Sequence, residues 1–154
     1  MTNRLRIVHQ KVILDAPIHD VFDYISDHEN YANWFPGAEG IEALKDLPKA
    51  QEGQVYKERL KLPSGKEVDM LITVVSSVRP SHFEMTGDFK PLHTNLLYEL
   101  DAISQEQTRM TVSFFTRHPI SFVRWLLRLM IRRRLNSSFA VALKTLSTRW
   151  AAKE

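Results

Sequence analysis

Near the start of the chain runs Leu14-Asp15-Ala16-Pro17-Ile18-His19-Asp20-Val21-Phe22, the segment that decides the fold. Before it, residues 5–14 alternate between two faces, as the residues of a strand do. Asp15 is predicted to cap the helix that follows, and Pro17 is tolerated in the first turn of that helix. Apolar residues then recur at helical spacing, which predicts a short helix with one buried face formed by Ile18, Val21, Phe22 and Ile25.

A second joint follows at Asp27-His28-Glu29-Asn30-Tyr31-Ala32-Asn33-Trp34-Phe35-Pro36. Ser26 or Asp27 is expected to cap a shorter turn of helix that carries Tyr31 and Trp34. Pro36-Gly37 is a turn signal and is expected to end it. The chain therefore begins with one strand and two short helices.

The middle of the chain is rich in strand signals. Alternating or β-branched runs, separated by short polar or proline-containing links, predict six further strands at residues 41–47, 54–62, 67–78, 82–87, 95–102 and 108–116. Because the links are of hairpin length, the sheet is expected to be mostly antiparallel.

The last element is a helix without proline or glycine, predicted from about Ile120 to about Ala152. At 1.5 Å per residue it would span roughly 45–50 Å, which exceeds a typical strand, so we expect one end to overhang or bend. One apolar stripe follows its length, formed by Val123, Leu127, Ile131, Leu135, Phe139, Ala142, Leu146 and Trp150. The element order predicts an α+β fold over residues 1–154, taken as one domain, with an apolar cavity between the sheet and this helix.

Several of these segments resemble the START/Bet v 1-like (SRPBCC) superfamily, and within it the bacterial polyketide cyclase/dehydrase and lipid-transport group. The resemblance lies in Asp15-Ala16-Pro17, Val21-Phe22, Ser26-Asp27, Trp34-Phe35-Pro36 and the closing helix from Pro119 to Ala152. It implies a helix-grip fold, in which a curved seven-stranded antiparallel sheet wraps around the C-terminal helix. It also implies binding of hydrophobic molecules such as lipids, quinones, sterols or polyketides, and some members are aromatases or cyclases.

Composition excludes several classes of function. The chain has no cysteine, which excludes disulfides and thiol catalysis and suits a reducing compartment. The six histidines are scattered without metal-site spacing, and each is expected to be a surface or turn residue. The five glycines form no phosphate loop, so neither a metal nor another cofactor is expected. The start of the chain lacks a signal-peptide pattern and no stretch is apolar enough to span a membrane, so a cytoplasmic location is expected.

Charge is unevenly distributed along the chain. From Arg117 to Glu154 lie nine of the 21 lysines and arginines but only one of the 18 acidic residues. The simpler interpretation is a solvated helix face. The alternative is contact with an anionic membrane surface through Arg124, Arg128 and Arg132. No nucleic-acid-binding module accompanies this charge, and nucleic acid is not expected as a partner.

Large adaptable side chains are more numerous than the packing of two short helices requires. Those predicted to contact a hydrophobic ligand are Trp34, Phe35, Tyr56, Met70, Phe83, Met85, Tyr98, Phe114, Leu135 and Phe139. Polar groups expected to orient such a ligand are Tyr56, Tyr98 and Asn136. The predicted function is therefore binding or carriage of a lipid, quinone or polyketide-like molecule.

Two other functions remain open. Possible acid–base groups occur on the predicted strands, but their alternation with apolar residues predicts that Glu58, Asp69, Glu84, Tyr98 and Glu99 point mostly to water. No catalytic residue is therefore assigned. A cyclase or dehydratase would instead use a cavity-facing acid or His93, whereas a protein-interaction module would show a tightly packed core and a large exposed apolar patch.

Overall fold

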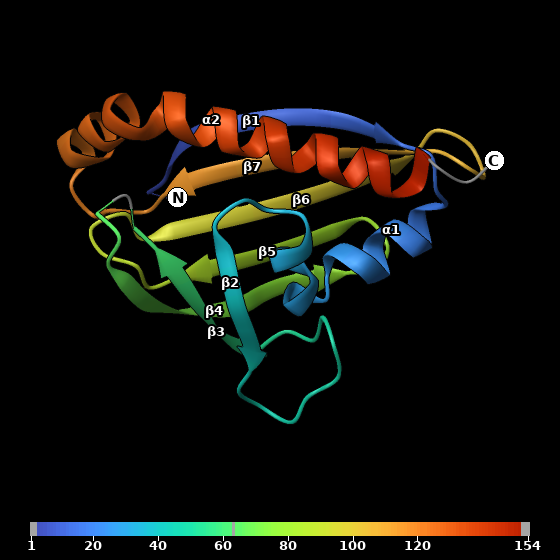
Figure 1. The fold of residues 1–154 in the computed structure, drawn as a ribbon, viewed down its shortest axis with the longest axis horizontal. Coiled ribbons are helices and arrows are strands. Elements are labelled where there is room, and N and C mark those ends of the chain that lie inside the picture. The colour runs from blue at the N-terminus through green and yellow to red at the C-terminus, as the bar shows by residue number, and fades with distance from the viewer. Residues whose placement is uncertain (1–2, 63, 152–154) are drawn as a thin grey trace.

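Seven antiparallel strands form one curved sheet, with a long helix beside one edge and two short helices over the face toward the viewer in Figure 1. The structure is a computed structural model that describes residues 3–62 and 64–151. In chain order the elements are β1 (Leu5–Leu14), α1 (Ile18–Ile25), the 3-10 helix η1 (His28–Asn33), β2 (Ala38–Ala43), β3 (Val55–Lys61), β4 (Glu67–Val78), β5 (His82–Gly87), β6 (Thr94–Ala102), β7 (Thr108–Thr116) and α2 (Ser121–Ala151).

The strand order across the sheet is β1-β7-β6-β5-β4-β3-β2, and every neighbouring pair is antiparallel. Consecutive strands from β2 to β7 are therefore neighbours, and β1 pairs with β7. The segment with α1 and η1 carries the chain from β1 at one edge of the sheet to β2 at the other. The predicted α+β helix-grip fold, with its element order and its antiparallel sheet, is confirmed. None of the described helices is long and apolar enough to cross a membrane.

Most predicted boundaries agree closely with the structure, and the second strand is the clearest difference. The second strand occupies Ala38–Ala43 and not residues 41–47, because the segment after it leaves the sheet before returning as β3. The predicted helix end at Ala152 lies outside the described residues.

The cap of α1 differs from the prediction. Pro17 stands at the N-cap without a side-chain hydrogen bond, and the Asp15 carboxylate instead accepts a 2.9 Å hydrogen bond from Gln107. The cap of η1 agrees with the prediction, because the Asp27 carboxylate accepts a hydrogen bond from the backbone N–H of Glu29. This cap determines where η1 begins and so places His28 in its first turn.

The helix α2 lies beside β1, and the two are joined by hydrogen bonds from the Gln10 amide to the carbonyl and side-chain oxygens of Asn136. The predicted apolar stripe is fully buried only in the second half of α2, where its members are Phe139, Ala142, Leu146 and Trp150, joined by Leu143.

The reason for this division is length. From Asn136 back to Ser121 the helix extends roughly 22 Å. From Gln10 back to Leu5 the strand extends only roughly 17 Å. The first turns of α2 therefore reach past the beginning of β1, as the orange part of the helix shows (Figure 1).

Candidate functional site

A small cavity of about 50 Å³ lies inside the sheet, between its concave face and η1. Its walls come from η1 and five neighbouring strands, β3 to β7, and are formed by His28, Tyr31, Glu58, Met70, Ile72, Met85, Thr86, Gly87, Thr94, Leu96 and Phe114. The lining is mainly apolar, with one pair of ionisable side chains. That combination is typical of sites that bind small organic molecules.

The position of the cavity differs from the expected one, because no residue of α2 lines it. Of the residues predicted to contact a ligand, Met70, Met85 and Phe114 form part of the wall. Gly87 is needed in the same wall, because a Cβ atom at that position would overlap Thr94 Oγ1 and Met70 Sδ.

The other predicted contact residues surround the cavity without lining it. Trp34, Tyr56, Phe83, Tyr98 and Phe139 are buried, whereas Phe35 and Leu135 are half-buried against the core. A ligand contact by these residues therefore requires the cavity to enlarge, and it stays a prediction.

Several of these aromatic rings contact one another in a row that runs from η1 to α2. The Phe35 ring lies 4.8 Å from the ring of Tyr31, stacked on it, and 4.8 Å from the ring of Phe139. Phe139 in turn lies 5.8 Å from Phe114, a wall residue. Phe35 and Phe139 therefore separate the cavity from the outer surface of α2.

The polar feature of the cavity is a buried pair formed by His28 and Glu58. His28 Nε2 lies 2.9 Å from Glu58 Oε1, and the two residues are 1% and 2% exposed. Here the prediction that Glu58 points to water is wrong. Glu58 has the same parity on β3 as the buried Tyr56, so the strand pattern already contained a signal for the inward orientation.

His28 was expected to be an ordinary surface or turn histidine, and that expectation is also wrong. Its ring stacks on Tyr31 at 4.7 Å and lies edge-on to Tyr56 at 5.3 Å. No sequence pattern links His28 to Glu58, because the two residues are 30 positions apart and meet only when η1 folds over β3.

Three buried polar atoms near this pair have no hydrogen-bond partner among the described residues: His28 Nδ1, Trp34 Nε1 and the Tyr98 hydroxyl. Unpaired buried polar groups are uncommon, because each costs desolvation energy that no bond returns. The prediction that Tyr98 faces water is wrong as well, since this residue is fully buried.

Burial raises the pKa values of Tyr98 and Tyr31 well above the ordinary value. The negative charge of Glu58 adds to both shifts, and Tyr98 also contributes to the shift of Tyr31. Both phenols are thus held in the neutral form, which can donate a hydrogen bond.

The sequence from residue 6 to residue 150 matches the family described as polyketide cyclase/dehydrase and lipid transport. The chain belongs to this family. The predicted resemblance is therefore confirmed over almost the whole chain. No curated protein matches the chain in sequence.

Solved structures of several other proteins show the same fold. A START superfamily protein from Mycobacterium smegmatis is 14% identical, with a TM-score of 0.72 over 95% of this chain and 97% of that one. The Zhui aromatase/cyclase from Streptomyces sp. R1128 is 17% identical, with a TM-score of 0.69 over 97% of both chains. The di-domain aromatase/cyclase StfQ of the steffimycin biosynthetic pathway is 11% identical, with a TM-score of 0.72 over 95% of this chain. This chain spans about half the length of StfQ, 51%.

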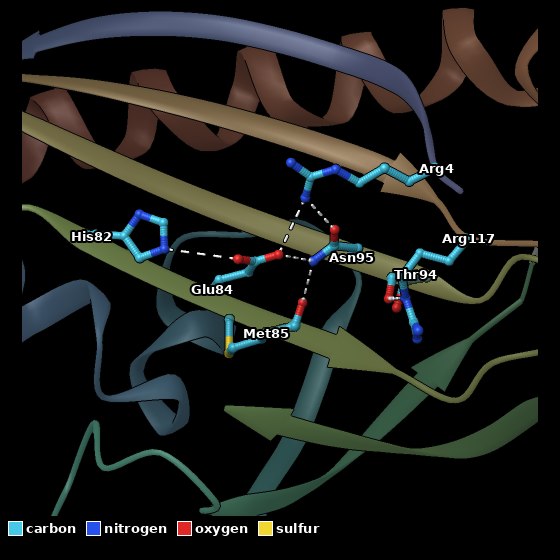
Figure 2. Close-up of polar contacts among 7 residues, drawn as sticks. All are labelled: Arg4, His82, Glu84, Met85, Thr94, Asn95 and Arg117. Atoms are coloured by element: carbon cyan, nitrogen blue, oxygen red, sulfur yellow. Dashed lines mark hydrogen bonds and ion pairs between the residues drawn. The ribbon is translucent and has the colours of Figure 1, made fainter. Parts of the chain in front are cut away.

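A second polar cluster lies on the opposite face of the sheet. Glu84 Oε2 accepts hydrogen bonds from Arg4 Nη1 at 3.2 Å and from Asn95 Nδ2 at 2.9 Å (Figure 2). The Arg4 guanidinium also lies 3.8 Å above the Phe115 ring. These contacts bind the segment before β1 to β5, β6 and β7, so Glu84 is engaged in a structural network away from the cavity.

The remaining acid–base candidates also lie elsewhere. Asp69 and Glu99 are exposed on β4 and β6, and His93 lies in the β5–β6 loop with its ring 5.5 Å from that of His118. Asn136, predicted to orient a ligand, bonds to Gln10 instead. No group of three or more histidine, aspartate or glutamate side chains within the described segments is arranged to hold a metal ion.

Proposed function

We propose that this protein binds a hydrophobic small molecule with one polar group, of the lipid, quinone or polyketide-like class, in the cavity beside His28 and Glu58. The observation that supports the proposal is a buried polar pair facing a mainly apolar cavity. Apolar contact supplies affinity at about 25 cal/mol per Å² removed from water. The His28–Glu58 pair then orients the polar group of the ligand. The family to which the chain belongs includes lipid transport in its description.

The cavity must enlarge to hold such a molecule. A volume of about 50 Å³ accommodates a few water molecules. Met70 and Met85 line the cavity and are adaptable, because methionine has several rotatable bonds and a polarisable sulfur. We expect the ligand to displace the Phe35 and Phe139 rings outward, which would bring the surrounding aromatic side chains into contact with it.

A cyclase or dehydratase activity is the second candidate, and the same pair of side chains favours it. If His28 Nε2 donates its proton to Glu58 Oε1, Nδ1 carries a free lone pair. A neutral imidazole held in this way is suited to remove a proton from a carbon beside a carbonyl group, which is a step in closing a polyketide-like ring. The neutral Tyr31 and Tyr98 hydroxyls are the candidate donors to the oxygen of that carbonyl.

The binding proposal is tested by a substitution on β6 that fills the cavity, compared with a matched substitution on the opposite face of the same strand. Leu96 lines the cavity, while Leu97 has the same 8% exposure on the other face of β6. Leu96→Phe is expected to lower binding of decylubiquinone and oleic acid at least about tenfold, since each lost methylene-sized contact costs ~0.8 kcal/mol. Leu97→Phe is the matched control and should bind like the unmodified protein.

Native mass spectrometry and probe titration provide the two measurements. The unmodified protein should retain small molecules from its expression host, and Leu96→Phe should retain fewer of them. Equal binding by the two variants would show that the ligand does not bind in this cavity. For the enzyme candidate, His28→Phe should abolish turnover of a poly-β-ketone mimic while a bound mimic is still detected. Turnover unchanged by this substitution would exclude the proposed role of His28.

A further inference from the structure

The first half of α2 has a surface that the hydrophobic core does not explain. Between Ser121 and Ser138, all of them described, no side chain is fully buried. Five large apolar side chains are 40% to 70% exposed, namely Phe122, Trp125, Leu126, Leu129 and Met130. A stretch of helix that packed only against its own sheet would place such residues inward.

The five residues form one continuous stripe, which we call the outer stripe. Their spacing of three, four, seven and eight residues from Phe122 places them on a single helix face. The rings of Phe122 and Trp125 lie 6.2 Å apart on this face. On an ideal helix the centre of the outer stripe lies roughly 110–130° around the axis from the buried residues Phe139 and Leu146, with Trp125 at the edge nearer to them.

The charge near the outer stripe has only one sign. Residues 121–138 contain five arginines and no acidic residue. Of these, Arg132, Arg133 and Arg134 are exposed, whereas Arg124 and Arg128 are half-buried and Arg124 bonds to the His118 carbonyl oxygen. The exposed charge therefore gathers at residues 132–134, beside the end of the outer stripe, and not along the row of Arg124, Arg128 and Arg132 that the sequence had indicated.

We propose that the first half of α2 docks on an anionic lipid bilayer, with the outer stripe in the headgroup and acyl boundary. A helix with exposed large apolar residues, a tryptophan and only positive charge is complementary to such a surface. Two copies of this chain are the less suitable occupant, because a symmetric contact through the outer stripe would bring the arginines of both copies together.

A groove lies beside the outer stripe. It is lined by Met130, Arg133 and Ser137 on α2 and by Pro36 on the loop after η1. The next residue inward is Phe35, whose ring stacks on the cavity residue Tyr31. Docking would thus place the bilayer at the Phe35 side of the cavity; this last step rests on the proposed function, whereas docking itself does not.

The experiment is co-sedimentation of the ligand-free protein with vesicles of phosphatidylcholine mixed with phosphatidylglycerol, and with vesicles of phosphatidylcholine alone. Binding is expected only to the anionic vesicles, and it should fall steeply as salt rises. Each positive charge is worth about fivefold in partitioning, so Arg133→Gln with Arg134→Gln should lower it by about thirtyfold. Trp125→Ser with Leu129→Ser should abolish binding to the anionic vesicles.

Two controls separate the outer stripe from general effects. Lys45→Gln removes an exposed charge in the loop between β2 and β3, and Val78→Ser removes a similarly exposed apolar side chain on β4. Both should bind like the unmodified protein, and circular dichroism should show every variant to be folded. Trp125 also provides a direct signal, because Trp34 and Trp150 are buried and a blue shift of emission on vesicle contact reports on Trp125.

Three results would overturn the proposal. The first is equal binding to neutral and anionic vesicles, and the second is binding that the arginine substitutions leave unchanged. The third is a dimer of the free protein that Trp125→Ser with Leu129→Ser dissociates, which would assign the outer stripe to self-association. Leu96→Phe should still bind vesicles normally, so failure of the cavity proposal and failure of docking are distinguishable.

Discussion

Tyr98→Phe should stabilise this protein, although replacing a buried tyrosine in this way usually destabilises one. The Tyr98 hydroxyl is buried and has no partner among the described residues. A buried polar group without a partner costs about 1–3 kcal/mol. The ring keeps its neighbours in the variant, because Trp34 and Phe83 lie at 6.0 and 6.3 Å from it. We therefore expect the free energy of unfolding of the ligand-free protein to rise by about 1 kcal/mol.

The advantage of this variant should grow in alkali. Burial, with the charge of Glu58, raises the pKa of Tyr98 above the ordinary value of 10.0. The stability that this raised pKa contributes is therefore fully present below pH 10 and is lost as the pH rises through the folded-state value. Phenylalanine has no such proton to lose, so unfolding of the variant should depend less on pH above 10.

The assay is urea unfolding of delipidated protein, followed by circular dichroism at neutral and alkaline pH. Tyr24→Phe is the control, since Tyr24 is half-buried and packs edge-on to Trp150 at 5.6 Å; its effect should stay within about 0.5 kcal/mol. A loss of about 1 kcal/mol or more in Tyr98→Phe would refute the reasoning, because it would mean that the hydroxyl is already bonded. With decylubiquinone or oleic acid present, the variant should bind more weakly if the hydroxyl is kept for the ligand.

Four further substitutions test the core, the polar pair and the surface by urea unfolding. Phe139→Ala should cost about 3–5 kcal/mol because this residue is fully buried, and a much smaller loss would mean that its ring borders open space. Glu58→Ala should cost about 3–5 kcal/mol by leaving His28 unpaired, whereas Glu58→Gln keeps an acceptor and should cost clearly less; equal losses would contradict this. The hydrogen bond from Arg79 holds the pKa of Asp23 below its ordinary value of 3.8, so the stability from this pair is present above pH 3.8 and is lost as the pH falls through the lowered value. The pair is more than half exposed, so Asp23→Asn should cost at most about 1 kcal/mol at pH 7 and nothing in strong acid; a loss that does not change with pH would be inconsistent with the pair.

The side chains of β3 show which part of the cavity could be predicted from the sequence. On β3, Tyr56 and Glu58 share a parity, so burial of one indicated burial of the other. Carboxylates usually face solvent, which favoured an exposed Glu58. That prediction was wrong because Glu58 is paired with His28. The identity of that partner was not predictable, since it depends on how η1 packs over the sheet.

For α2 too, the sequence predicted the helix itself, but not which of its apolar residues are buried. Its existence, its beginning near Ser121 and its apolar spacing all followed from the absence of proline and glycine and from helical periodicity. Periodicity alone marked Val123, Leu127, Ile131 and Leu135 as equivalent to Phe139, yet the structure buries them only partly. The difference arises because α2 is longer than the strand beside it.

The sequence by itself determined the order and type of the elements, the antiparallel sheet and the family, because these depend on spacing, turn residues and caps within a few positions of one another. Only the tertiary structure decided that the cavity lies under η1 and not under α2, that His28 meets Glu58 across 30 positions, and that the outer stripe of α2 is left uncovered. Each of these depends on the register and relative length of elements that are distant in the chain. Such contacts join residues that are far apart in the sequence, so no local pattern of residues predicts them.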